Sequence, residues 1–130
     1  MLKKILIVDD DKIVRNMLAL FLERFHCDFD TAFNAEEALG LIGQKRYDAV
    51  FTDYQMPGMN GIELIRNIRA KSPHSAVILM TGCADEEMIR HSGADACLMK
   101  PFSADAFKES LDRVLHEDRR GSHASHTDGG

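Results

Sequence analysis

Short apolar runs alternate with amphipathic helical patterns along almost the whole chain, and no other feature constrains its fold as strongly. The apolar runs have the length of buried strands and are too short to span a membrane. A further run alternates apolar with polar residues, which is typical of a half-exposed strand. The five predicted strands are, in chain order, Ile5–Val8, Cys27–Ala32, Ala49–Thr52, Ala76–Met80 and Ala96–Met99. Strands that alternate with helices indicate βαβ units and a parallel sheet.

Helical periodicity fills the stretches between these runs. Asn34 and Glu37 form a pair typical of a helix N-terminus, Gly61 opens another helix, and Ser72-Pro73 ends it because proline disfavours helical angles in the residue before it. A short helix is predicted over Asp85–His91. The residues expected to face the core are Ile13, Val14, Met17, Leu18, Phe21, Leu22, Phe25, Ala35, Ala38, Leu39, Ile42, Ile62, Ile65, Ile68, Phe107, Leu111 and Val114. We therefore predict an α/β protein with a flavodoxin-like, doubly wound, five-stranded parallel sheet in strand order 2-1-3-4-5 and helices on both faces.

The chain has 130 residues, which is the size of one domain. We expect the folded domain to span residues 1–117. Residues 118–130 are polar or glycine without apolar periodicity, so we expect a disordered tail there. A net charge of -5 argues against direct binding of nucleic acid. The sequence has no signal-like or membrane-spanning segment, so we expect a cytoplasmic protein that does not contact the membrane.

Polar side chains follow four of the predicted strands at the point where each strand ends. Asp9 and Asp10 follow the first strand, Asp53 the third, Thr81 the fourth and Lys100 the fifth. The carboxyl ends of parallel strands meet at one edge of the sheet, where ligands usually bind. In the predicted strand order the first and third strands are neighbours. We therefore expect the three aspartates to share one crevice.

Carboxylates that share a crevice repel one another unless a cation lies between them. A site with oxygen ligands, and without histidine or cysteine, favours a hard ion such as Mg²⁺. Asp53 is a candidate nucleophile because aspartate forms acyl phosphates. Lys100 could place a positive charge on a transferred phosphoryl group, and Thr81 could donate a hydrogen bond to it. Asp11, in contrast, is expected to cap the first helix.

Four stretches of the chain resemble the receiver domain of two-component response regulators of the chemotaxis-regulator type. They are Ile5–Asp11, Thr52–Gly61, Leu79–Gly82 and Lys100–Phe102. The resemblance covers roughly residues 3 to 116. It implies a phosphoacceptor switch in which Asp53 receives a phosphoryl group from the phosphohistidine of a sensor histidine kinase or a phosphotransfer protein. A protein of this kind is not an enzyme in the ordinary sense, since it catalyses only its own phosphorylation and dephosphorylation.

The resemblance also implies roles for the other strand-end residues. Asp9, Asp10 and Asp53 would hold Mg²⁺ together with the backbone carbonyl of Gln55. Thr81 and Lys100 would bind the phosphoryl oxygens, the Lys100–Pro101 peptide would be cis, and Gln55 and Cys83 would tune self-dephosphorylation. A monomer or a weak, phosphorylation-dependent dimer is expected, with an output partner that the sequence does not identify.

The sequence departs from the family pattern in two places. Cys97 stands where family members usually carry an aromatic residue that moves with the threonine. The segment from Thr81 to Lys100 is shorter than usual by roughly three residues, close to one helical turn, so the fourth helix, between Met88 and Gly93, must be short or partly unwound. A receiver-like binding module with an altered or phosphorylation-independent readout is therefore a second hypothesis. A remote third is an aspartyl phosphatase, although Gln55 stands where such enzymes typically carry a second aspartate.

Overall fold

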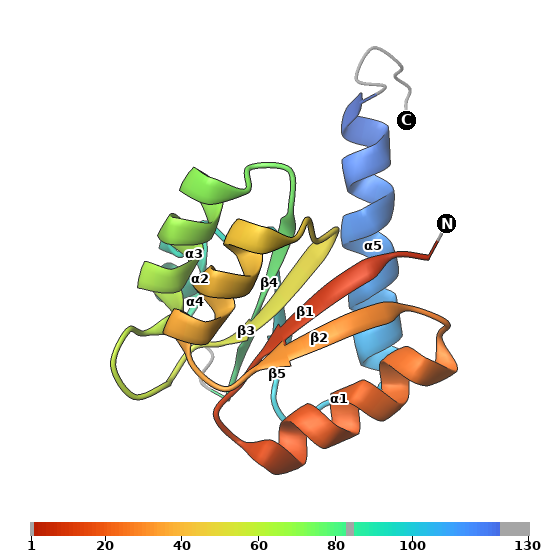
Figure 1. Cartoon of the computed structure of the whole chain (residues 1–130), viewed down its shortest axis with the longest axis horizontal. Helices are drawn as coiled ribbons and strands as arrows, with labels where there is room; N and C mark the ends of the chain where they lie inside the picture. Colours follow the sequence, from red (N-terminus) through yellow and green to blue (C-terminus); the bar gives the residue numbers. More distant parts are fainter. Residues whose placement is uncertain (1, 83–84, 123–130) are drawn as a thin grey trace.

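The computed structural model describes residues 2–82 and 85–122, and its five parallel strands form one sheet (Figure 1). The strands lie in the order β2-β1-β3-β4-β5, as predicted. Their bounds are β1 Lys4–Val8, β2 Asp28–Ala32, β3 Ala49–Asp53, β4 Ala76–Thr81 and β5 Ala96–Met99. The order reverses between β1 and β3, so the switch point of the doubly wound sheet lies there.

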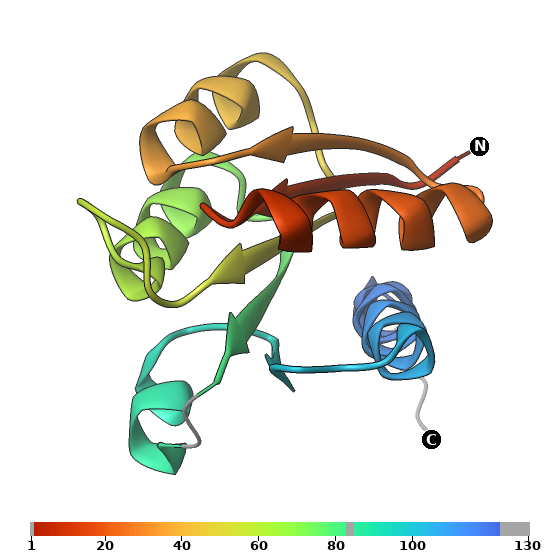
Figure 2. The same cartoon turned by 90° about the horizontal axis from the view of Figure 1, so that it is seen from below.

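The helices cover both faces of this sheet (Figures 1 and 2). α1 (Lys12–Arg24) and α5 (Ala104–Ser122) pack on one face. α2 (Ala35–Gln44) and α3 (Gly61–Lys71) pack on the other. α4 (Glu86–His91) lies on the same side as α2 and α3, and Met88 connects it to their core. The predicted fold class is confirmed.

Successive residues of the strands point to opposite faces, so the sheet separates two apolar cores. Leu6 and Val8 of β1 belong to the core under α2 and α3. Ile5 and Ile7 belong to the core under α1 and α5, where Phe51 of β3 packs against Phe107 with ring centroids 4.5 Å apart. A central strand that is buried on both faces holds the residues at its end in fixed positions.

Side-chain caps open each of α1, α2, α3 and α4, as short polar residues favour. Asp11 Oδ1 accepts the backbone N–H of Ile13 at 2.9 Å, which confirms its predicted role at the start of α1. Asn34 Oδ1 accepts the N–H of Glu37 at 2.8 Å, but the Glu37 carboxylate accepts the N–H of Phe33 rather than that of Asn34. A complete capping box, which was not predicted, opens α3, where Asn60 and the side chain three residues on bond reciprocally.

Two of the predicted core positions are wrong. Ile13 is 77% exposed, because it lies about 140° around the helix from the buried Leu18 and so falls outside the inward stripe. Ile62 is half-buried and, unlike the other half-buried positions predicted, packs against neither core, whereas Leu64, which was not predicted, is fully buried with Ile65. Both errors come from extending an apolar pattern by one residue at its edge.

The C-terminal helix is longer than the sequence indicated. α5 continues to Ser122, so residues 118–122 of the predicted tail are helical. Residues 123–130 lie outside the described part of the chain, and the domain boundary stays a prediction. α4 is short, as expected, and contains no buried residue. Within the described ranges, every helix is too short or too polar to cross a lipid bilayer.

A candidate acidic site at the carboxyl edge of the sheet

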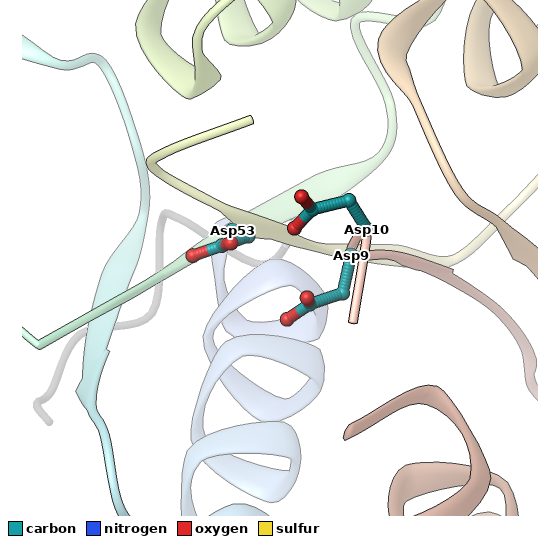
Figure 3. Close-up of side chains that lie close together, drawn as sticks. All are labelled: Asp9, Asp10 and Asp53. Atoms are coloured by element: carbon teal, nitrogen blue, oxygen red, sulfur yellow. The ribbon is translucent and has the colours of Figure 1, made fainter. Parts of the chain in front are cut away.

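Three carboxylates converge where the neighbouring strands β1 and β3 end. Asp53 is the last residue of β3, and Asp9 directly follows β1, whose Val8 lies beside Thr52. One carboxylate oxygen from each of Asp9, Asp10 and Asp53 lies within 4.8 Å of the others. Figure 3 shows the three side chains directed into a common space. The predicted convergence of these residues is therefore present.

The three aspartates differ in their exposure to solvent. Asp9 is fully buried, Asp53 is 9% exposed and Asp10 is exposed. Carboxylate oxygens are the ligands that hard cations prefer, and Mg²⁺ usually keeps several waters beside one or two carboxylates. An exposed carboxylate beside two buried ones suits such an ion, because solvent can reach one side of it. The residues present therefore fit Mg²⁺.

Lys100, which follows β5, places its ammonium between two of these carboxylates. Its Nζ lies 2.8 Å from Oδ2 of Asp9 and 3.3 Å from Oδ1 of Asp53. The backbone N–H of Lys100 donates to the carbonyl oxygen of Thr81 at 2.8 Å, which fixes the residue against the end of β4. The Lys100–Pro101 peptide is cis, as the resemblance implied. The sequence placed Lys100 at this edge but gave no sign that it would pair with Asp9.

The pKa values of this group follow from burial and charge. Burial raises the pKa of Asp53, and repulsion from Asp9 raises it further, while Lys100 acts in the opposite direction. Burial alone would lower the pKa of Lys100, but its hydrogen bond and charge interaction with Asp9, and then those with Asp53, outweigh burial and raise it. Lys100 therefore stays charged and favours the ionised form of Asp53, the form that a nucleophile needs.

The remaining predicted site residues differ in how close they lie to the three carboxylates. Thr81 ends β4 and is buried, one strand away from Asp53, which pairs with Met80 in the sheet register. Gln55 is exposed in the loop after β3, where it lines a shallow hollow together with Tyr54 and neighbouring loop residues. Cys83 lies outside the described residues.

Cys97 lies on β5 opposite Leu79 and is half-buried. Burial raises the pKa of its thiol, so the side chain stays neutral at physiological pH. Its volume is much smaller than that of a tyrosine or phenylalanine ring. α4, which precedes β5, buries no residue. The small Cys97 side chain and the short α4 are the two departures from the receiver-domain pattern that the sequence indicated.

Arg15 is a site residue that was not predicted from the sequence. Its guanidinium Nη1 donates to the backbone carbonyl of Asp9 at 2.7 Å from the first turns of α1. The backbone N–H of Asp9 donates to Ala32 of β2 at 3.1 Å, and Oδ1 of Asp9 accepts the N–H of Asp11 at 2.9 Å. A cation in the first turns of a helix that follows an acidic triplet is the sequence signal that could have identified it.

Comparison with known proteins gives a consistent picture. The family model described as "Response regulator receiver domain" matches residues 5–112. The chain is 37% identical to the transcriptional regulatory protein ResD of Bacillus subtilis over 127 residues, which is 95% of this chain but only 51% of that protein. It is 36% identical to the chemotaxis protein CheY-3 of Vibrio cholerae, covering 86% of this chain and 91% of that one. The chain thus spans about half of one relative and nearly all of the other.

A solved structure agrees with these sequence matches. It is the response regulator protein TrrA of Thermotoga maritima in complex with Mg²⁺ and a beryllium fluoride. The two structures superimpose with a TM-score of 0.80 at 35% identity, over 87% of this chain and 99% of that one.

Proposed function

This chain belongs to the response regulator receiver domain family of two-component systems, and from that premise we propose that Asp53 is its phosphoacceptor. The phosphoryl donor is the phosphohistidine of a sensor histidine kinase or a phosphotransfer protein. One observation carries the proposal: one carboxylate oxygen from each of Asp9, Asp10 and Asp53 lies within 4.8 Å of the others, with the Lys100 ammonium 3.3 Å from Oδ1 of Asp53. That arrangement combines a nucleophile, a cation site and a fixed positive charge.

The transfer requires one bond to form and one to break. A carboxylate oxygen of Asp53 attacks phosphorus, the phosphorus–nitrogen bond of the donor breaks, and the imidazole leaves and takes up a proton. Lys100 and Thr81 hold oxygens of the transferred group, since both lie at strand ends beside Asp53. A magnesium ion held by Asp9, Asp10, Asp53 and the carbonyl of Gln55 would neutralise negative charge that develops on that group. The complex of TrrA with Mg²⁺ and a phosphoryl-like fluoride supports this assignment by analogy.

Phosphorylation changes the charge at the place where Lys100 is already shared between two acids. A phosphoryl group on Asp53 offers the ammonium a stronger partner than Asp9 does. Movement of Lys100 and Thr81 toward it biases a pre-existing equilibrium between two conformations of the β4–α4–β5 region. This switch operates in the cytoplasm, and its output partner is a separate protein or a further domain.

A second candidate function is a receiver-like binding module whose readout does not depend on this movement. Two features of the β5 edge favour it. Cys97 has no aromatic ring whose rotation could be coupled to the movement of Thr81, and no residue of α4 is buried against the sheet. The acceptor chemistry is the same in both candidates, and they differ in how far its effect spreads.

One experiment tests the acceptor site and separates the two candidates. Amide NMR spectra are recorded in the presence of Mg²⁺, with and without beryllofluoride, for the wild type and for Asp53→Asn. We expect shifts around Asp9 and Lys100 in the wild type, and none in the variant. Shifts that continue through residues 85–99 support the switch, whereas shifts confined to the strand ends support the binding module. Equal responses in both proteins would exclude Asp53 as the acceptor.

A further inference from the structure

Arg15 contacts the backbone of the acidic site, and among the described residues its guanidinium forms no ion pair with the site's carboxylates. Its Nη1 donates to the carbonyl oxygen of Asp9 at 2.7 Å, and the side chain is half-buried. We propose that Arg15 is a positioning residue that orients the Asp9–Asp10 peptide and thereby directs the carboxylate of Asp10 toward the cation. This inference rests on the proposed function, because it concerns the affinity of the same site for Mg²⁺.

The argument begins with the rigidity of the peptide unit. The carbonyl of Asp9 and the N–H of Asp10 belong to one planar group. A hydrogen bond that fixes the carbonyl therefore also fixes the direction in which the chain reaches Asp10. Arginine suits this role because its planar guanidinium is always charged and its fork of donors is pre-organised. A bond from a charged donor is also stronger than one between neutral groups.

The carboxylate of Asp10 depends on this backbone more than its neighbours do. Oδ1 of Asp9 accepts the N–H of Asp11, and Oδ2 accepts Lys100, so that side chain is held from both sides. Asp53 is held by the end of β3 and by Lys100. The Asp10 side chain is exposed, and among residues 2–82 and 85–122 its carboxylate accepts no hydrogen bond. Figure 3 shows that it nevertheless points to the side where Asp53 lies.

The two possible roles of Arg15, as a nearby positive charge or as a residue that orients the peptide, predict opposite changes in Mg²⁺ affinity when its side chain is removed. If the guanidinium acted only as a nearby positive charge, its loss would strengthen the binding of Mg²⁺, because like charges repel. If it orients the peptide, its loss weakens the binding, because a ligand is no longer held in place. Changes to residues that orient metal ligands typically cost about 10–100-fold in affinity. The sign of the change therefore discriminates between the two roles.

The test measures Mg²⁺ binding by calorimetry in the wild type, Arg15→Met, Arg15→Lys and Arg24→Met. Arg24 provides the matched control, since it is an exposed arginine in the last turn of α1. We expect Arg15→Met to bind Mg²⁺ about tenfold more weakly, Arg15→Lys to fall between it and the wild type, and Arg24→Met to match the wild type. Unchanged or tighter binding by Arg15→Met would overturn the proposal.

A second readout separates positioning from damage to the fold. Labelling by acetyl phosphate is followed as a function of Mg²⁺ concentration. A positioning role predicts that Arg15→Lys needs more Mg²⁺ for half-maximal labelling but reaches the wild-type maximum. A lowered maximum with an unchanged half-saturation would contradict it, and this test holds even if Arg15→Met does not fold. If the wild type itself binds no Mg²⁺, the proposed function fails; if the wild type binds it and the Arg15 variants bind it equally well, the role of Arg15 fails.

Discussion

A Cβ atom at Gly61 would lie 2.6 Å from the backbone carbonyl oxygen of Asp53. The first residue of α3 thus touches the end of the strand that carries the proposed phosphoacceptor. The N–H of Gly61 donates to the carbonyl of Tyr54 at 2.8 Å, which holds the helix start in this place. The loop that includes Gln55 must therefore close tightly, and only glycine leaves room for that closure.

Replacing Gly61 with alanine should destabilise the protein and disturb the site. The added methyl group meets backbone atoms, which cannot rotate away as a side chain can. We expect a loss of about 1–3 kcal/mol, the usual cost of overpacking, and weaker Mg²⁺ binding, since Gln55 lies in the displaced loop. Urea unfolding and calorimetry measure the two effects. The control is Gly40→Ala, in an exposed position of α2 with open space around it, which should stabilise the protein by about 0.5–1 kcal/mol. Equal effects of the two variants would contradict this account.

Replacing Lys100 with methionine should tighten the binding of Mg²⁺. The ammonium lies 3.3 Å from Asp53 and 2.8 Å from Asp9, where it competes with a divalent cation. Like charges a few ångströms apart repel by at least about 1 kcal/mol even in water, so the affinity should rise by about fivefold or more. Calorimetry on Lys100→Met tests this, with Lys108→Met as control because Lys108 pairs with the exposed Asp112 on α5. Weaker binding by Lys100→Met would show that the lysine organises the carboxylates rather than competing for them.

The amino end of the sheet carries a charge cluster that should make stability depend on pH. Burial alone would raise the pKa of Asp30, but hydrogen bonds from Tyr47 at 2.6 Å and Lys45 at 3.1 Å outweigh burial and lower it. A lowered pKa in the folded state stabilises the fold above the unfolded value of about 4. That contribution is lost as the pH falls through the lower, folded-state pKa.

Asp30→Asn should therefore cost the most stability near pH 7 and progressively less below about pH 4. At neutral pH we expect a loss of about 1–3 kcal/mol, typical of hydrogen bonds to a charged group. Urea unfolding of both proteins at several pH values measures the difference. Asp28→Asn is the control, since Asp28 is 56% exposed and pairs with Lys4 at the surface, where such pairs contribute little. A difference between wild type and Asp30→Asn that does not change with pH would be inconsistent with the lowered pKa.

The fold was predictable because most of it depends on patterns in neighbouring residues. Strands that are buried on both faces appear in the sequence as continuous apolar segments. The acidic residues that follow them indicated the carboxyl edge of the sheet. The predicted strand order alone was enough to place Asp9, Asp10 and Asp53 in one crevice. Strict alternation of strands and helices leaves few possible orders for a parallel sheet.

The errors lie where a residue's environment depends on distant parts of the chain. Ile13 continues an apolar pattern but lies outside the inward face of α1, which only the packing of that helix against the sheet decides. The bond from Arg15 to a main-chain carbonyl leaves only a weak sequence signal, a cation in the first turns of a helix that follows three acids. The pairing of Lys100 with Asp9 joins two residues that are 91 positions apart in the sequence. Such contacts follow from the fold and cannot be read from local spacing.

Labelling with acetyl phosphate in the presence of Mg²⁺ tests the central claim most directly. The wild type and Asp53→Asn are labelled in parallel, and peptides from the wild type are analysed by mass spectrometry. The account predicts one phosphoryl group on the peptide that contains Asp53, no label on the variant, and loss of labelling when the metal is chelated. Label retained by Asp53→Asn, or found on another residue of the wild type, would contradict it.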